Sequence, residues 1–117
     1  MGKIYINENQ VLVKKMIEIY KPDQFDWMSY QITVSNVLTF HHIVEQSKGG
    51  LTIIENGALI TKKGHRALNM LESRDISLYI AWNQLFQEIN KSFQPPDTYY
   101  IEESKVLKKH TQKVLHR

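Results

Sequence analysis

The chain has 117 residues, of which 42% are hydrophobic and 10% aromatic, so it can build one modest core and does not resemble a disordered protein. No apolar run reaches the roughly 20 residues needed to cross a bilayer, and the absence of cysteine excludes disulfides and cysteine-based metal sites. The formal net charge of +3 is too small to indicate nucleic-acid binding by itself. We therefore expect a single domain spanning residues 1–117.

The N-terminal third predicts one helix followed by extended chain. Residues 7–20 have an amphipathic pattern with Asn7 as a candidate N-cap, and Pro22 ends the helix. The aromatic-rich residues 23–30 fit either a short helix or an irregular packed segment. Residues 31–43 are rich in β-branched side chains and favour extended structure, which the Ser35-Asn36 step divides into two pieces.

The central third predicts two short strands and a helix. Residues 45–50 are polar and include Gly49 and Gly50, so they form a loop. The Asn56-Gly57 step predicts a tight turn, because both residue types tolerate positive φ, and residues 58–61 form a second strand. A helix follows from residue 62 to residue 71, and its inward-facing residues are Ala67, Leu68 and Leu71.

The C-terminal third predicts two helices. Asp75 caps the first, which runs to about residue 90 with strongly apolar residues at Leu78, Tyr79, Trp82, Leu85, Phe86 and Ile89. This helix has more apolar surface than one face can bury, so a homodimer and a deeply buried helix in a monomer are both open. Two prolines at 95–96 interrupt the chain before a basic helix over residues 102–116.

Histidine and asparagine side chains form the most informative pattern. One predicted strand ends in His41 and His42, and the following helix has His65 and Asn69 one turn apart on the same face. Neighbouring strand residues point to opposite faces, so one imidazole of the pair can face the helix while the other faces a substrate. Such a set can assemble a single-metal site, although an adjacent histidine pair alone would be a weak signal.

This pattern resembles the HNH nuclease family, and specifically the His-His variant of colicin-type DNases, over about residues 38–72. Asn56 lies fourteen residues after His42, and His65 lies nine residues after Asn56. The resemblance implies an α+β fold that is mostly helical. Its centre would be a ββα-metal (His-Me finger) module, made of a short antiparallel hairpin and a helix. Residues 1–37 and the helices in residues 75–117 would form the scaffold.

The resemblance also implies a role for each site residue. His41, His65 and Asn69 would bind one divalent metal ion, His42 would be the general base, and Asn56 would brace the loop. An unperturbed imidazole is largely neutral at neutral pH, which suits His42 as a base. The family often has a second histidine at the position of Asn69, and an amide oxygen is a weaker ligand, so Mg²⁺, Mn²⁺, Ni²⁺ and Zn²⁺ all stay open.

Positive charge gathers in the second half of the chain. From residue 61 onward the chain has ten Lys and Arg residues against six Asp and Glu, whereas residues 1–60 have five against six. Lys62, Lys63 and Arg66 lie beside the predicted site and are candidate contacts for the phosphates of nucleic acid, with double-stranded DNA the expected substrate. A second basic cluster covers residues 105–117, where nucleic-acid binding and an ordinary solvated helix face are equally good interpretations.

The sequence thus predicts a metal-dependent endonuclease that hydrolyses phosphodiester bonds. The family includes phage, mobile-element, restriction and toxin nucleases. The first residues lack the apolar run of a signal peptide, so we expect a cytoplasmic protein with no membrane partner. Two alternatives stay open: a catalytically weakened HNH-like module that binds nucleic acid or protein, and an unrelated helical interaction domain.

Overall fold

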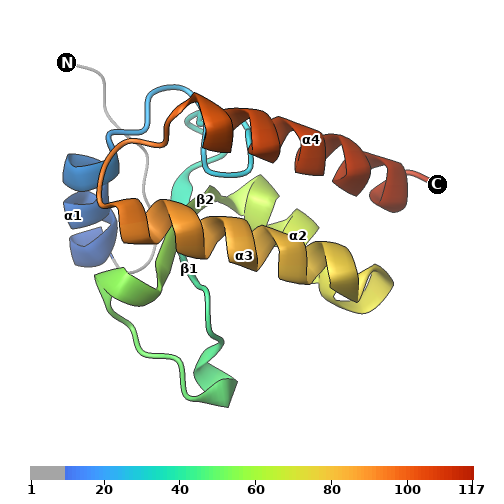
Figure 1. Cartoon of the computed structure of the whole chain (residues 1–117), viewed down its shortest axis with the longest axis horizontal. Helices are drawn as coiled ribbons and strands as arrows, with labels where there is room; N and C mark the ends of the chain where they lie inside the picture. The colour runs from blue at the N-terminus through green and yellow to red at the C-terminus, as the bar shows by residue number, and fades with distance from the viewer. Residues whose placement is uncertain (1–9) are drawn as a thin grey trace.

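A computed structural model describes residues 10–117, in which helices surround a two-stranded antiparallel sheet (Figure 1). The helices are α1 (Gln10–Tyr20), α2 (Lys62–Arg74), α3 (Ile76–Ser92) and α4 (Thr98–Leu115), and the strands are β1 (Leu38–His42) and β2 (Gly57–Thr61). Two short 3₁₀ turns, η1 (Gln46–Lys48) and η2 (Ile54–Asn56), lie between the strands. This confirms the mostly helical α+β fold with a hairpin that leads directly into a helix. Asn7 lies outside the described residues.

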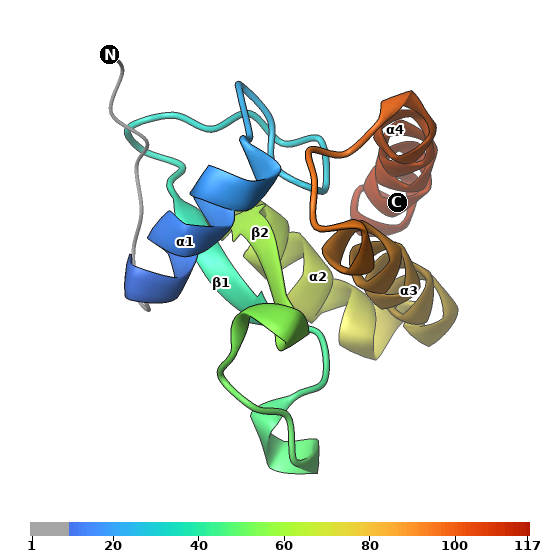
Figure 2. The same ribbon diagram turned by 60° about the vertical axis from the view of Figure 1, so that its left-hand side comes forward.

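The hairpin is enclosed by helices on both faces. Leu38 pairs with Thr61 at one end and His42 with Gly57 at the other, where the long loop between the strands begins. Helix α1 contacts β1, whereas α2 and α3 pack on the opposite side of the hairpin and α4 lies over both of them (Figure 2). None of the helices in residues 10–117 has the length and apolarity that spanning a membrane requires.

Two of the three helix starts predicted in the second half of the chain, those of α2 and α3, are confirmed. The side chain of Thr61 accepts a hydrogen bond from Gly64 N (3.1 Å), and that of Asp75 accepts one from Leu78 N (3.1 Å), so each satisfies a donor of the first turn. The predicted inward-facing residues of α2 are buried: Ala67, Leu68 and Leu71.

The apolar surface of α3 is largely used within the chain. All of its predicted apolar residues are buried, namely Leu78, Tyr79, Trp82, Leu85, Phe86 and Ile89. Ile76 and Ile80 are the exceptions, with exposed fractions of 55% and 48%. The core of a single chain therefore buries most of the apolar side chains of this helix, so their burial requires no second copy. The homodimer stays a prediction.

The segment from 21 to 37 is irregular and is held to the hairpin by a buried carboxylate. Asp26 accepts hydrogen bonds from Met28 N (2.8 Å), Tyr30 N (2.9 Å) and Thr61 N (2.7 Å). Burial raises the pKa of Asp26, and these bonds act against that effect. The aromatic-rich stretch is thus a packed loop and not a helix.

Extended structure is shorter than the sequence indicates. The β-branched residues 31–43 yield only β1, because the chain turns back between Thr33 and Asn36, which form an isolated bridge. The Asn36 side chain stabilises this turn by donating to Gln31 O (2.8 Å) and accepting from Lys63 N (2.8 Å). The predicted break at the Ser35-Asn36 step is therefore present.

The predicted Asn56-Gly57 turn is wrong. Gly57 has φ −106° and ψ 150°, which is ordinary extended backbone, and it begins β2. Space rather than conformation requires glycine here, because a Cβ would lie 2.4 Å from the Phe40 ring and 2.9 Å from Met16 Sδ. The start of α4 also differs from the expectation. This helix begins at Thr98 and not at residue 102, because the side chain of Asp97 accepts a hydrogen bond from Tyr100 N (3.3 Å) and caps its first turn.

Asn90 joins α3 to the start of β2. Its Nδ2 atom donates to Ile54 O and to Gly57 O, both at 2.7 Å, and its backbone oxygen accepts from the Tyr20 hydroxyl (2.5 Å). Asn90 is 4% exposed, so water cannot readily replace the lost donor. We expect Asn90→Ala to lower the free energy of unfolding by about 2–3 kcal/mol, because Gly57 O and Ile54 O each lose a buried donor, although Ile54 O keeps its bond from Gly57 N.

Urea denaturation followed by circular dichroism measures this effect. The matched control is Gln87→Ala, at an exposed position on the same helix, where a change within about 0.5 kcal/mol is expected. Equal stability of the two variants would contradict the role assigned to Asn90.

Candidate functional site

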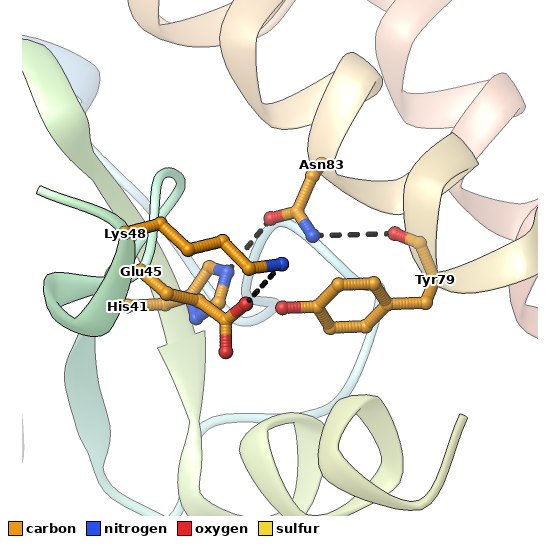
Figure 3. Close-up of polar contacts among 5 residues, drawn as sticks. All are labelled: His41, Glu45, Lys48, Tyr79 and Asn83. Carbon is orange, nitrogen blue, oxygen red and sulfur yellow. Dashed lines mark hydrogen bonds and ion pairs between the residues drawn. The ribbon is translucent and has the colours of Figure 1, made fainter. Parts of the chain in front are cut away.

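His41 lies near the end of β1, on the face of the hairpin that α3 covers. It is 6% exposed, and its Nε2 atom donates to Asn83 Oδ1 at 2.8 Å (Figure 3). Asn83 Nδ2 in turn donates to Tyr79 O (3.3 Å), which fixes the amide with its oxygen toward the imidazole. The strand and α3 together therefore determine the orientation of the His41 ring.

The environment keeps His41 neutral. Burial lowers its pKa from 6.5 to about 4, and the hydrogen bond to Asn83 only partly offsets that effect. The Phe86 ring meets the imidazole edge-on, with centroids 5.6 Å apart. A neutral imidazole is the form that binds a metal ion, so no proton has to be removed from His41 at neutral pH.

His65 comes from α2 and meets His41. The two imidazole centroids are 5.4 Å apart, with the rings nearly perpendicular. Thr39 Oγ1 lies 2.9 Å from His65 Nδ1 and donates its own proton to Ile60 O (2.8 Å). Since that proton is committed, Thr39 accepts from Nδ1–H of His65, so Nε2 is the nitrogen that holds the lone pair whenever the ring is neutral. Fixing the tautomer through the other ring nitrogen is typical of metal-binding histidines.

His42 lies on the opposite face of the hairpin from His41, as strand alternation requires. Its Nε2 atom is 2.9 Å from Thr52 Oγ1 in the long loop, and its ring meets Phe40 edge-on with centroids 4.9 Å apart. It is half-buried, and burial lowers its pKa, which favours the neutral form. The imidazole thus stands where the hairpin opens into the loop.

Asn56 holds the two ends of that loop together. Its Oδ1 atom accepts from Val44 N (2.8 Å), and its Nδ2 atom donates to Val44 O (3.0 Å) and to Leu51 O (2.9 Å). The side chain therefore replaces strand pairing just beyond His42, at the point where the two strands separate.

Replacing Asn56 with aspartate tests this arrangement. The carboxylate keeps the acceptor for Val44 N but loses both donors and faces two carbonyl oxygens, so we expect a loss of about 1–3 kcal/mol in unfolding free energy. We also expect faster proteolytic cleavage within residues 45–53. Asn69→Asp, at an exposed position, is the matched control. A loop that is cut no faster than in the control would contradict the bracing contact.

The remaining predicted residues stand further from the imidazole pair. Asn69 lies one turn beyond His65 on α2 and is exposed. Lys62, Lys63 and Arg66 are exposed along the first turns of the same helix, and Lys63 Nζ lies 6.0 Å from the centre of the Tyr30 ring. The structure thus brings His41 and His65 together. Lys62, Lys63 and Arg66 lie near the N-terminal end of α2.

Sequence reasoning missed the part of the site that α3 and the loop contribute. A hollow of about 260 Å³ is lined by residues of both, among them Glu45, Lys48, Tyr79 and Asn83, the hydrogen-bond partner of His41. Glu45 pairs with Lys48 at 3.1 Å, and Tyr79 reaches toward them from α3 (Figure 3). Burial, and then the charges of Glu45 and Glu72, raise the pKa of Tyr79.

A signal for this contribution is present in the sequence. Tyr79, Asn83 and Phe86 are spaced i, i+4 and i+7, so they share the buried face of an otherwise apolar helix. A polar residue on such a face needs a partner, and here the partner is His41.

The side chains that could act as metal ligands limit how a metal ion can be bound. Within residues 10–117 no group of three His, Cys, Asp or Glu side chains is arranged to bind a metal. The chain offers two imidazoles, His41 and His65, together with the amide oxygens of Asn69 and Asn83. This set fits a divalent ion whose other positions are filled by water or by phosphate oxygens, as in open catalytic sites.

Comparisons with known protein families, with curated proteins and with solved structures found no match.

Proposed function

We propose that this protein is a metal-dependent endonuclease of the HNH type, which hydrolyses phosphodiester bonds in nucleic acid, with double-stranded DNA as the expected substrate. One observation supports the proposal most. Two imidazoles from different elements, His41 on β1 and His65 on α2, meet with centroids 5.4 Å apart, and Asn83, the hydrogen-bond partner of His41, lines a hollow.

In this proposal His41 and His65 bind one divalent ion, with Asn69 or Asn83 as the source of an amide oxygen. A bound ion would polarise the scissile phosphate and stabilise the charge of the departing 3′ oxygen. Nε2 of His65 is the donor nitrogen, since Nδ1 is committed to Thr39. In His41 the Nε2–H group donates to Asn83, so Nδ1 holds the lone pair that would bind the ion.

His42 acts as the general base. With Nε2–H donating to Thr52, Nδ1 holds the lone pair and takes a proton from the attacking water. The water oxygen bonds to phosphorus as the bond to the 3′ oxygen breaks, which yields a 5′-phosphate and a 3′-hydroxyl. Asn56 keeps His42 at the loop entrance, and Lys62, Lys63 and Arg66 contact flanking phosphates without reading the base sequence.

A second candidate function is binding without cleavage. The hydrogen bond between His41 and Asn83 and the exposed position of Asn69 both favour a weakened metal site. In that case the same surface would bind nucleic acid or a protein partner but would not hydrolyse it.

Plasmid cleavage distinguishes the two functions. Purified protein is incubated with supercoiled plasmid in Mg²⁺, Mn²⁺, Ni²⁺ or Zn²⁺, and separately in EDTA, and metal binding is measured by calorimetry. We expect nicked or linear plasmid in at least one metal and none in EDTA. A folded protein that binds metal but leaves the plasmid intact supports the binding module, and one that binds no divalent metal contradicts both metal-based assignments.

A further inference from the structure

A hollow that the proposed mechanism does not use lies away from the imidazole pair, between the 21–29 segment and α4. Its volume is about 780 Å³, within the range of small-molecule and nucleotide sites. Trp27 lines it, and the Trp27 ring packs on Phe86 with centroids 6.3 Å apart, while Phe86 meets His41 on its other side. The core of the protein therefore separates this groove from the candidate site.

The groove combines exposed rings with positive charge. Phe25 is 53% exposed, and Tyr100 is half-buried with an edge-on contact to Tyr99 (centroids 5.4 Å apart), so each ring still has some accessible surface. Four lysines line the same groove, Lys21, Lys105, Lys108 and Lys109. Aromatic rings interleaved with lysines are the features that bind unpaired nucleotides, in which bases stack and phosphates meet cations.

Acidic residues only partly offset this charge. Asp23 and Asp26 also line the groove, but the Asp26 carboxylate already accepts three backbone hydrogen bonds. Lys105 pairs with Glu102 at 3.2 Å on the exposed surface of α4, and Lys108 donates to Ser29 O (2.7 Å). Lys21 and Lys109 are exposed, so the charge that faces a ligand is positive.

One buried polar atom at this groove also lacks a partner. Trp27 Nε1 is buried and has no hydrogen-bond acceptor within residues 10–117. The other indole of the chain, Trp82, donates to Thr111 Oγ1 at 2.9 Å. Because the Trp27 ring lines the groove, this indole N–H is a sensitive reporter of a ligand bound there.

We propose that this groove binds an unpaired stretch of nucleic acid, with bases on Phe25 and Tyr100 and phosphates at the lysines of α4. This binding needs no metal and no hydrolysis, so it holds whether or not the histidine site cleaves. In a nuclease it would keep a displaced or frayed strand on the face opposite the cutting site.

Fluorescence anisotropy of fluorescein-labelled (dT)12 in EDTA tests the proposal. We expect Phe25→Ala to raise the Kd roughly tenfold through lost stacking. The Lys105→Gln/Lys109→Gln variant should weaken binding and reduce the slope of log K against log salt by about 1.4, roughly 0.7 for each lysine. The matched control is Lys91→Gln/Lys113→Gln, which removes two exposed lysines that do not line the groove and should leave Kd within about twofold.

A second readout does not depend on substitutions. In ¹⁵N-labelled protein, the indole N–H resonance of Trp27 should shift on addition of (dT)12, whereas that of Trp82 should stay in place. Equal losses in the control and groove variants would overturn the proposal. So would tighter binding of a poly-glutamate peptide of the same length, which would make the groove a site for acidic protein segments.

Discussion

Replacing His42 with alanine should reduce plasmid cleavage by roughly 10²–10⁴-fold, the usual contribution of a positioned general base. The imidazole stands at the loop entrance, with its Nε2 atom 2.9 Å from Thr52 Oγ1, and burial lowers its pKa so that the neutral form prevails at neutral pH. Without it, water attacks with no group to take its proton. Single-turnover cleavage at a fixed metal concentration measures the loss directly.

Measuring metal affinity distinguishes a variant that lacks the general base from a variant that lacks a metal ligand. His42 lies on the opposite face of the hairpin from His41 and His65, so His42→Ala should bind the ion about as tightly as the unchanged protein. His65→Ala should instead weaken metal binding by tenfold or more, because one of two imidazole donors is gone. His110→Ala, at an exposed position on α4, is the control for both. Cleavage by His42→Ala at the unchanged rate would remove the base from the proposal.

Local signals in the sequence were enough to predict where α2 and α3 begin and which of their residues are buried. Thr61 and Asp75 cap α2 and α3 through their own side chains, and the buried residues of both helices follow the expected period. These features depend on neighbours three or four residues away, so the chain encodes them within short segments.

Long-range packing determined what the sequence could not predict. Gly57 is required by the Phe40 ring and Met16, which come from β1 and α1, and not by a local turn. Asn83 reaches His41 across 42 positions of the sequence, so no spacing motif contains the pair. The candidate site is therefore formed by three elements, whereas the motif describes only the hairpin and α2.

Protonation of His41 should make the fold strongly sensitive to mild acid. Its pKa is about 4 in the folded chain and 6.5 in the unfolded chain, because burial disfavours the charged ring. The unfolded state therefore binds more protons between these values, so stability is complete above pH 6.5 and falls as the pH drops toward 4. A shift of this size corresponds to about 3 kcal/mol, at roughly 1.4 kcal/mol per pKa unit.

Comparison with His41→Gln isolates this contribution from other groups. Asp26, whose pKa is raised by burial, also titrates in acid but acts with the opposite sign, and it is present in both proteins. Glutamine cannot take up the proton, and its amide offers an N–H donor toward Asn83 Oδ1. In urea titrations with EDTA from pH 7.5 to pH 4, the stability difference between the two proteins should therefore shrink by about 3 kcal/mol.

The position of that change along the pH axis tests burial of the imidazole itself. His110→Gln removes an exposed histidine on α4 and should reproduce the profile of the unchanged protein. A difference between wild type and His41→Gln that is constant from pH 7.5 to pH 4 would mean that His41 takes up its proton as easily in the folded chain as in the unfolded one. The ring would then have to reach water, and α3 could not cover it as the contacts to Asn83 and Phe86 require.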